Sequence, residues 1–110
     1  MKKKVAKVGK RAARTVRLGA NRVRATQNLG NGFRRHVLSN VTIAANQIIR
    51  IELQAPSDRR VISGGWTITQ LTNAYATDSY PETPSLWVLY ISNPTNTTRT
   101  ITPYLITKRR

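Results

Sequence analysis

Hydrophobic and polar residues alternate along the second part of the chain, in short runs with a period of two. Between residues 47 and 55, Ile49, Ile51 and Leu53 alternate with polar or charged residues. A period of two places one set of side chains on a buried face and the other set in solvent, which is typical of a half-buried β-strand. The segment Pro56-Ser57-Asp58 ends this run, because all three residues favour turns.

The same pattern predicts most of the remaining strands. They are expected over residues 36–45, 60–70, 85–92 and 99–107, and the polar segment 71–83 is either a weak strand or a long loop. Within them, Gly64-Gly65 favours a bulge or a close backbone approach. Pro103 favours an edge or a bulge in the last strand, because proline cannot donate to a neighbouring strand. Five or six short strands predict an all-β fold, a small antiparallel β-sandwich that is jelly-roll-like.

The aromatic residues divide between the predicted core and the predicted surface. Trp66 and Trp87 fall within apolar alternation and are expected in the core. Tyr75 and Tyr80 lie in the polar segment, which makes them candidates for contacts with a neighbouring subunit. An aromatic platform for sugar or single-stranded nucleic acid is the alternative for these four residues. A body of about 70 residues without a disulfide is marginal alone, so we expect assembly to stabilise it.

Positive charge is concentrated at the two ends of the chain. Of the net charge of +15, residues 1–35 carry +12 with no acidic residue, and residues 108–110 carry +3. Residues 36–107 contain four arginines and four acidic residues and are therefore neutral. This partition predicts a basic N-terminal arm and linker over 1–35, a β-sandwich domain over 36–107 and a basic C-terminal tag over 108–110.

The predicted arm has an apolar face at helical spacing, with cations on its other faces. Gly9 and Gly19 interrupt this face and each costs about 1 kcal/mol in a helix interior, so we expect the arm to become helical or extended only on a surface. Residues 28–32 are expected to form a flexible joint. The apolar face consists of Val5, Val8, Val16 and Val23, with Ala12 and Ala20 between them. The predicted anchoring residues, which would contact phosphates or a shell, are Lys2, Lys3, Lys4, Lys7, Lys10, Arg11, Arg14, Arg17, Arg22, Arg24, Arg34 and Arg35.

Three kinds of surface could order such an arm. Nucleic acid suits the density of Lys and Arg, because phosphate neutralisation needs no sequence code. An acidic protein surface, such as one face of a shell, suits the arm equally well. An anionic membrane suits it less, because the apolar face has Val and Ala but no Trp, Phe or Leu. The arm therefore points to nucleic acid or to protein as its partner.

The composition disfavours catalytic and metal-binding chemistry. The chain has no cysteine, one histidine and four carboxylates, which excludes thiolate sites and two-histidine metal sites. Asp78 and Glu82 are expected to be a solvated pair, and His36 is expected on the surface beside two arginines. No apolar stretch reaches the length of a membrane-spanning helix. We expect no enzymatic activity, no cofactor, no metal, no small-molecule substrate and no membrane span.

Four short motifs resemble those of a known family of β-domains. In sequence order they are Pro56…Arg60-Val61-Ile62-Ser63-Gly64-Gly65-Trp66, Ser79-Tyr80-Pro81, Trp87–Pro94 and Thr100–Thr107. They resemble a β-domain of phage virion proteins and of some secreted bacterial proteins. Those relatives often have cysteines where this chain has Ala55 and Thr107, so the disulfide that the resemblance implies is absent. The resemblance implies a β-sandwich structural module without catalysis, and a basic arm before such a module is similar to the layout of many viral coat proteins.

These features together predict a virion structural protein: a minor capsid, decoration or appendage-joining component of a bacteriophage particle. Its arm would anchor it in the virion, and its sandwich would assemble with copies of itself or with other virion proteins. Packaged nucleic acid is a further predicted partner of the arm. The alternative is a non-enzymatic nucleic-acid-binding protein of ribosomal or nucleoid type, and a carbohydrate-binding module is a weaker alternative.

Overall fold

A computed structural model describes residues 14–68 and 74–110 of the chain. The described residues form β-strands joined by short turns, with a single 3₁₀ turn, so the all-β prediction is confirmed. The elements are β1 (Arg14–Leu18), η1 (Ala20–Arg22), β2 (Val23–Gly30), β3 (Phe33–Leu38), β4 (Val41–Ile43), β5 (Gln47–Gln54), β6 (Arg59–Ile68), β7 (Tyr75–Thr83), β8 (Leu86–Asn93) and β9 (Arg99–Arg109).

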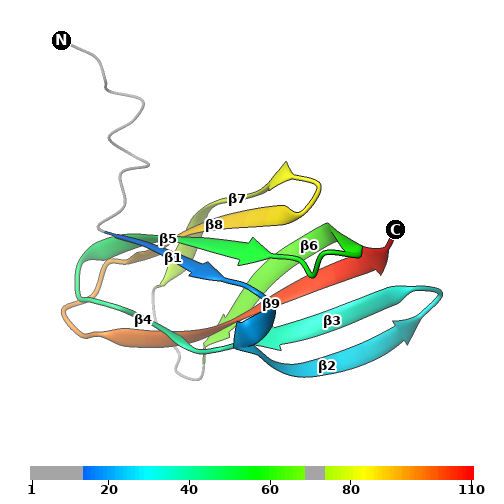
Figure 1. Cartoon of the computed structure of the whole chain (residues 1–110). Helices are drawn as coiled ribbons and strands as arrows, with labels where there is room; N and C mark the ends of the chain where they lie inside the picture. The colour runs from blue at the N-terminus through cyan, green and yellow to red at the C-terminus, as the bar shows by residue number, and fades with distance from the viewer. Residues whose placement is uncertain (1–13, 69–73) are drawn as a thin grey trace, which may run out of the picture.

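The strands form two sheets that pack face to face as a β-sandwich (Figure 1). The four-stranded sheet has the order β1-β5-β8-β7. The five-stranded sheet has the order β2-β3-β9-β4, and β6 pairs with the other edge of β9. Every pair is antiparallel except β1–β5, which is parallel. Strand β9 is therefore the centre of the five-stranded sheet, because β3, β4 and β6 all pair with it.

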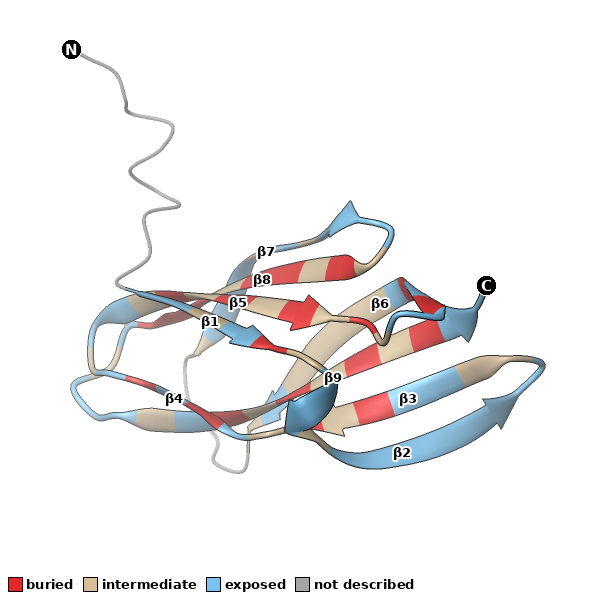
Figure 2. Cartoon of the chain, in the orientation of Figure 1, coloured by how far each residue is buried: buried red, intermediate tan, exposed pale blue. Residues whose placement is uncertain are grey.

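Residues from both sheets fill the core between them (Figure 2). On β5 the predicted alternation is confirmed, since Ile49, Ile51 and Leu53 are at most 1% exposed while their neighbours along the strand are half-buried. Trp66 and Trp87 are partly buried and pack against this core, as predicted. The interior is thus made by period-two alternation on strands of both sheets.

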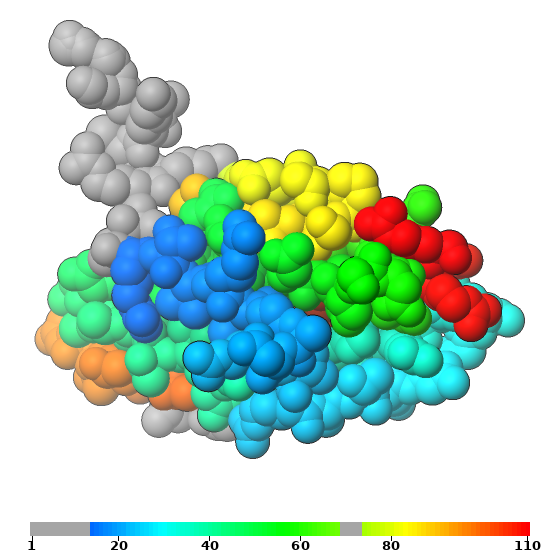
Figure 3. All heavy atoms as spheres, viewed as in Figure 1, coloured from blue at the N-terminus to red at the C-terminus, as the bar shows by residue number. Residues whose placement is uncertain are grey.

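The prediction of a separate arm over residues 1–35 is wrong for residues 14–35, which belong to the sandwich. Strand β1 pairs with β5 from Arg14 to Leu18, and its Leu18 is only 4% exposed. Val16 and Val23 pack against the core from strands, not from a helical face. Figure 3 shows the residues after position 13, in blue, lying against the rest of the molecule. The parallel pairing with β5 explains this, because it satisfies backbone groups that an isolated arm would leave to water. The predicted contacts of Lys2, Lys3, Lys4, Lys7, Lys10, Arg11, Val5 and Val8 lie outside the described residues.

The expected flexible joint at residues 28–32 is instead the turn of the β2–β3 hairpin. Gly30, Asn31 and Gly32 have φ angles of 90°, 56° and 86°, a left-handed conformation that glycine and asparagine adopt most readily. The Asn28 side chain accepts a hydrogen bond of 2.8 Å from the Gly30 amide. Strand β2 of this hairpin was not predicted, and it is one reason why the described residues contain more strands than the five or six expected.

Three other local predictions differ from the structure. The chain turns between β3 and β4, so the single strand predicted over residues 36–45 is two strands. Pro103 lies in the central strand β9 and not at an edge. It is tolerated there because β3 pairs with residues 104–108 of β9 and β4 pairs with residues 99–101. Pro103 therefore lies opposite the connection between β3 and β4. The predicted tag is also part of the sheet, since Lys108 and Arg109 end β9.

The Gly64-Gly65 pair provides the predicted close approach, whereas the bulge of β6 lies just before the pair. The register of β6 against β9 shifts between Val61 and Ser63. A Cβ atom on Gly64 would lie 2.4 Å from Cδ1 of Trp87, and a Cβ atom on Gly65 would lie 2.4 Å from Oη of Tyr104. Because successive residues of a strand point to opposite faces, the two glycines make room for one aromatic ring on each side of β6.

Candidate nucleic-acid interface on the five-stranded sheet

The charged residues of the described chain are divided unequally between the two sheets. The strands of the four-stranded sheet carry three arginines and three carboxylates. The strands of the five-stranded sheet carry eight cations and, within the described residues, no carboxylate. The four-stranded set is Arg14, Arg17, Arg50, Glu52, Asp78 and Glu82, and the five-stranded set is Arg24, Arg34, Arg35, Arg59, Arg60, Arg99, Lys108 and Arg109.

On the four-stranded sheet, opposite charges are paired. Glu52 accepts hydrogen bonds from Arg17 Nε at 2.8 Å and from Arg50 Nε at 2.9 Å, and Arg50 Nη2 lies 3.0 Å from Glu82 Oε2. Burial alone would raise the pKa of Glu52, but the hydrogen bonds and charges of Arg17 and Arg50 outweigh it and lower that pKa. Arg50 Nη1 also donates to the Tyr90 hydroxyl at 2.7 Å. Little unpaired charge is left on this sheet for a charged partner.

On the five-stranded sheet, the strand register places several cations on the face that points away from the core. Residues directly opposite one another in a sheet share a face. Lys108 lies opposite Phe33 of β3 and Arg60 of β6, while Arg35 lies opposite Ile106. These positions alternate with the buried residues of β9, so their side chains point outward, and the three cations are exposed.

Arg24 of β2 reaches the same face through a hydrogen-bonded bridge. Its Nη1 donates to Asn40 Oδ1 at 3.3 Å, and the same oxygen accepts a hydrogen bond of 2.8 Å from Thr102 Oγ1. Thr102 is two residues from Tyr104 on β9 and therefore shares its outward face. We name the four exposed cations Arg24, Arg35, Arg60 and Lys108 the outer cationic face.

A hollow of about 360 Å³ lies on this face and contains no acidic residue in its lining. Val37 lies opposite Tyr104, and Thr67 lies opposite Thr102, so β3, β6 and β9 all contribute to it. Its lining residues are Arg35, Val37, Thr67, Thr102 and Tyr104. One guanidinium, one phenol ring and two hydroxyl groups thus meet on an open sheet surface, a combination suited to an anionic ligand with a flat apolar part.

Behind this face, at the end of the sheet, a buried cation is held without a carboxylate in hydrogen-bonding contact. Arg59 is only 2% exposed; its Nε donates to Thr107 Oγ1 at 2.6 Å, and its Nη2 donates to the carbonyl of Gly32 in the hairpin turn. Burial, followed by the charge of Arg34, lowers the pKa of Arg59, and the Asp58 charge opposes this shift. Arg59 therefore joins β6, β9 and the β2–β3 turn and adds to the positive charge of this sheet.

His36 lies next to this arginine and is buried, so the expectation of a surface histidine is wrong. It is 4% exposed, with Nε2 2.8 Å from Thr107 Oγ1 and Nδ1 3.4 Å from Thr26 Oγ1. Because Thr107 Oγ1 accepts from Arg59, its own proton is free to point to Nε2, which assigns the ring proton to Nδ1. Burial, followed by the charges of Arg59 and Arg34, lowers the pKa of His36 and keeps the ring neutral near pH 7.

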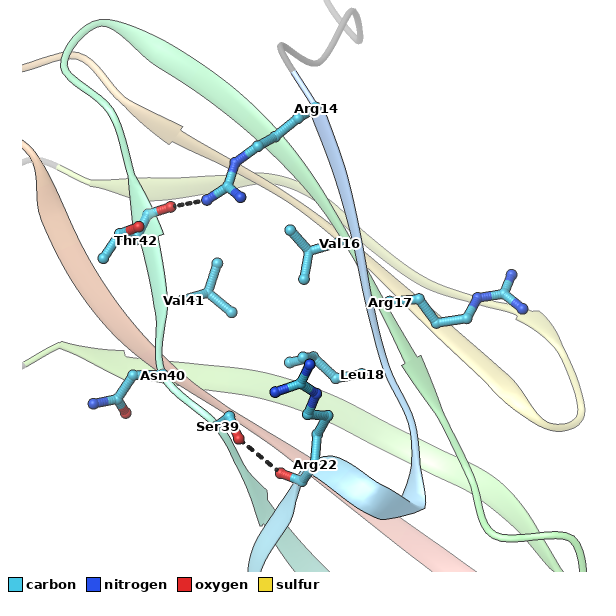
Figure 4. A pocket seen from close by; sticks show the side chains of 9 residues that line it. All are labelled: Arg14, Val16, Arg17, Leu18, Arg22, Ser39, Asn40, Val41 and Thr42. Carbon is cyan, nitrogen blue, oxygen red and sulfur yellow. Dashed lines mark hydrogen bonds between the residues drawn. The ribbon is translucent and has the colours of Figure 1, made fainter.

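A second hollow, of about 270 Å³, lies where β1 and β4 meet at the side of the sandwich (Figure 4). Val16, Leu18 and Val41 line it, while the Arg17 side chain points away from it (Figure 4). Arg14 reaches across to β4 and donates to the Thr42 carbonyl at 2.6 Å. Six of its nine lining residues are polar or charged, and the Arg14 contact joins β1 to β4, so the hollow is a seam between the edges of the two sheets.

Comparison with known proteins places the domain in a family. A family model described as YjdH matches residues 14–107. The chain belongs to the YjdH family. Neither a curated protein nor a solved structure matches it. The matched range runs from the first residue of β1 to two residues before the end of β9, so the YjdH domain covers nearly all of the described sandwich.

The YjdH domain separates the arginines that the charge partition had grouped in one arm. Arg14 and Arg17 lie on the four-stranded sheet, and Arg22 lies in the 3₁₀ turn. Arg24 and Arg35 lie on the outer cationic face, while Arg34, opposite Thr107, points to the other face of that sheet. The predicted cations therefore do not form one site.

Sequence reasoning missed other members of the interface. The charge partition assigned Arg60 to the neutral body and Lys108 to the tag, yet the two are register partners in the sandwich. The Gly64-Gly65 pair was the one sequence signal for this surface. It predicted that another group approaches the backbone closely, but it did not identify that group as the rings of Trp87 and Tyr104. Of the predicted subunit contacts, Tyr75 is 52% exposed on the edge strand β7, and Tyr80 is half-buried with its hydroxyl 3.5 Å from Arg50 Nη1.

Residues 14–68 and 74–110 contain neither a metal-ligand cluster nor a membrane-spanning helix. Within these ranges no group of three or more His, Cys, Asp or Glu side chains is placed to hold a metal ion. In the same part of the YjdH chain, no helix is long and apolar enough to cross a membrane.

Proposed function

We propose that the protein is a non-enzymatic structural component of a virion that contacts packaged nucleic acid through its outer cationic face. The observation that carries the proposal is the unequal division of charge, eight cations without a carboxylate on one sheet and balanced ion pairs on the other. Phosphate backbones bind such surfaces by displacing counterions and need no base-specific contact.

Solubility alone does not account for this division. A surface that only needs to be soluble intersperses both signs of charge, as the four-stranded sheet does. Four exposed cations on one sheet face repel each other and lower the stability of the folded state. A polyanionic partner compensates for that repulsion, which supports phosphate as the chemistry that the face recognises.

The assignment to a virion has separate support. It depends on the resemblance of the Gly-Gly-Trp, Ser-Tyr-Pro and Trp-to-Pro motifs to virion β-domains and on the basic residues 1–13. The balanced four-stranded sheet, with its exposed Tyr75 on edge strand β7, offers a surface for other virion proteins or for copies of the chain. The packing of Trp66 and Trp87 against the core disfavours the carbohydrate-binding alternative, which needs exposed rings.

Fluorescence anisotropy with a labelled 20-base-pair DNA at several salt concentrations tests the nucleic-acid part. The double variant Arg35→Gln/Arg60→Gln should weaken binding and reduce the slope of log affinity against log salt by about 1.8, the value for two lost phosphate contacts. The matched control is Arg14→Gln/Arg17→Gln, which lowers the net charge by the same amount on the other sheet. If both variants lose affinity equally, net charge alone governs binding and the outer cationic face is not the site.

Locating the protein in purified particles by mass spectrometry and cryo-electron microscopy tests the virion part. Absence from the particle, together with DNA binding that requires Arg35 and Arg60, would favour the second candidate, a nucleic-acid-binding protein of ribosomal or nucleoid type. The outer cationic face supports this candidate directly, because it needs no assembly to form. The two candidates also differ in solution: analytical ultracentrifugation should find an oligomer for the virion component and a monomer for the alternative.

A further inference from the structure

We infer that the outer cationic face binds single-stranded nucleic acid, with a base stacked on the ring of Tyr104. The inference rests on the proposed function, since it assumes that nucleic acid is the partner of this face. It adds the class of nucleic acid and the side chain that distinguishes that class.

The position of the Tyr104 ring is the first observation. A Cβ atom on Gly65 would lie 2.4 Å from Oη, 2.5 Å from Cζ and 2.9 Å from Cε2 of Tyr104. The ring therefore lies across the backbone of β6 at a position that has no side chain. One ring face covers Gly65, and the other faces away from the sheet on a residue that is only half-buried. An aromatic ring held flat on a sheet is a platform on which a base can stack.

The surroundings of the ring are the second observation. The hollow beside the ring is lined by Thr67, Thr102 and Arg35. One bound ligand could therefore contact the ring, the two hydroxyl groups and the guanidinium together. Further along β9, Lys108 Nζ lies 5.5 Å from the centre of the Phe33 ring, opposite Arg60. Two aromatic rings, Tyr104 of β9 and Phe33 of β3, thus lie on the same outward face as cations from β3, β6 and β9. Sites that bind single strands likewise combine cations for the phosphates with rings on which bases stack.

A duplex and an acidic protein fit these observations less well. The bases of a duplex are already stacked on one another, so a duplex can use the cations but not the open face of Tyr104. An acidic protein surface could also pair with the cations, yet the ring and the hollow beside it would add nothing to its recognition. The combination of both features favours an unpaired strand.

The test compares the affinities of the full chain for a labelled 20-nucleotide oligothymidine and for the 20-base-pair duplex. Tyr104→Ala should weaken oligothymidine binding by about 5- to 150-fold, the effect of losing one stacked base, and should change duplex binding less than 2-fold. Tyr104→Phe keeps the ring and should keep the affinity. Tyr75→Ala removes an exposed tyrosine from the other sheet and should have no effect.

Gly65→Ala provides a second variant, in which Tyr104 itself is unchanged. Its new methyl group would displace the ring from the sheet, so oligothymidine binding should fall while duplex binding persists. Far-ultraviolet circular dichroism and the melting temperature establish that each variant is folded. If Tyr104→Ala does not fold, Gly65→Ala decides the outcome.

The outcomes separate the inference from the proposed function. If the protein binds neither probe, or if Arg35→Gln/Arg60→Gln binds the duplex as tightly as the natural chain, the proposed function fails. If that double variant weakens binding but the Tyr104 and Gly65 variants bind oligothymidine normally, the stacking inference is overturned and the nucleic-acid function stands. Equal losses for duplex and oligothymidine on Tyr104→Ala also overturn the inference, because stacking on a single strand predicts a difference.

Discussion

The two sheets of this domain share one core but differ in the chemistry of their outward surfaces. On the four-stranded sheet, Arg50 connects Glu52, Glu82 and Tyr90 in one hydrogen-bonded network. On the five-stranded sheet, the outer cationic face has no such acidic partners among the described strands. Since both sheets come from one short chain, the difference shows that charge is sorted by strand pairing and not by position along the sequence.

The inward surfaces of the sheets should be equivalent, and truncating one buried leucine in each tests this. Leu53 and Leu105 are 0% and 1% exposed. Leu53→Ala and Leu105→Ala should each lower the free energy of unfolding by about 2–5 kcal/mol, because each leaves a cavity in the shared core. Urea denaturation measures the effect, and Ile62→Ala, at a residue that is 44% exposed, is the control. A much smaller loss for Leu105 would mean that the five-stranded sheet does not share the core.

Lowering the pH should affect the five-stranded sheet first, through His36. Its pKa is lowered from 6.5 in the folded state, so the unfolded chain binds the proton more readily. Stability should therefore be complete well above pH 6.5 and should fall as the pH drops below it, by no more than about 1.4 kcal/mol per pH unit. His36→Gln should remove this dependence between pH 7.5 and 5.5. The lowered pKa of Glu52 acts only at lower pH, since its stabilising effect is lost as pH falls through its folded value.

Salt should distinguish the outward surfaces of the two sheets. Between 20 and 300 mM NaCl, screening of the outer cationic face should raise the melting temperature by about 2–5 °C, corresponding to a fraction of a kcal/mol. The variant Arg24→Gln/Arg35→Gln/Arg60→Gln/Lys108→Gln should have a higher melting temperature than the natural chain at low salt, and its melting temperature should change less with added salt. Differential scanning fluorimetry is sufficient to measure this. A variant that responds as strongly as the natural chain would show that the repulsion lies elsewhere.

Breaking one ion pair on the four-stranded sheet should have the smallest effect. The side chain of Glu82 is 41% exposed, and its partner Arg50 keeps its bonds to Glu52 and Tyr90. Glu82→Gln should therefore lower the free energy of unfolding by about 0–1 kcal/mol. A loss of several kcal/mol in urea denaturation would mean that the Arg50 network is far more cooperative than its exposure indicates.

The strands that sequence patterns predicted are those with one face in the core. Strand β5 alternates because Ile49, Ile51 and Leu53 are buried while their neighbours are not. Strand β2 could not be predicted in this way, since all of its residues after Val23 are exposed and no period is present. In β1, Val16 and Leu18 do alternate, but the valines before and after them also fit a helical period. Only the long-range pairing with β5 decides between these two patterns.

The candidate interface was hidden for a related reason. Summing charge along residues 36–107 gives zero, because it offsets arginines such as Arg60 against four acidic residues, three of which the fold places on the other sheet, while Asp58 lies in the turn before β6. Lys108 and Phe33 are far apart in sequence, yet the β3–β9 register makes them opposite neighbours. The sequence also could not predict that Arg59 and His36 are buried. Both side chains are hydrogen-bonded to Thr107, which is far from them in sequence.

The central position of β9 also determines when the domain can fold during synthesis. Strands β3, β4 and β6 all take their hydrogen bonds from residues 99–109, so until these residues have been made, the β2–β3 hairpin is the only pair of the five-stranded sheet that can exist. A nascent chain of this domain therefore carries unpaired strand edges and apolar residues until translation has passed β9. Its exposure to aggregation or to chaperones is greatest just before the last strand emerges.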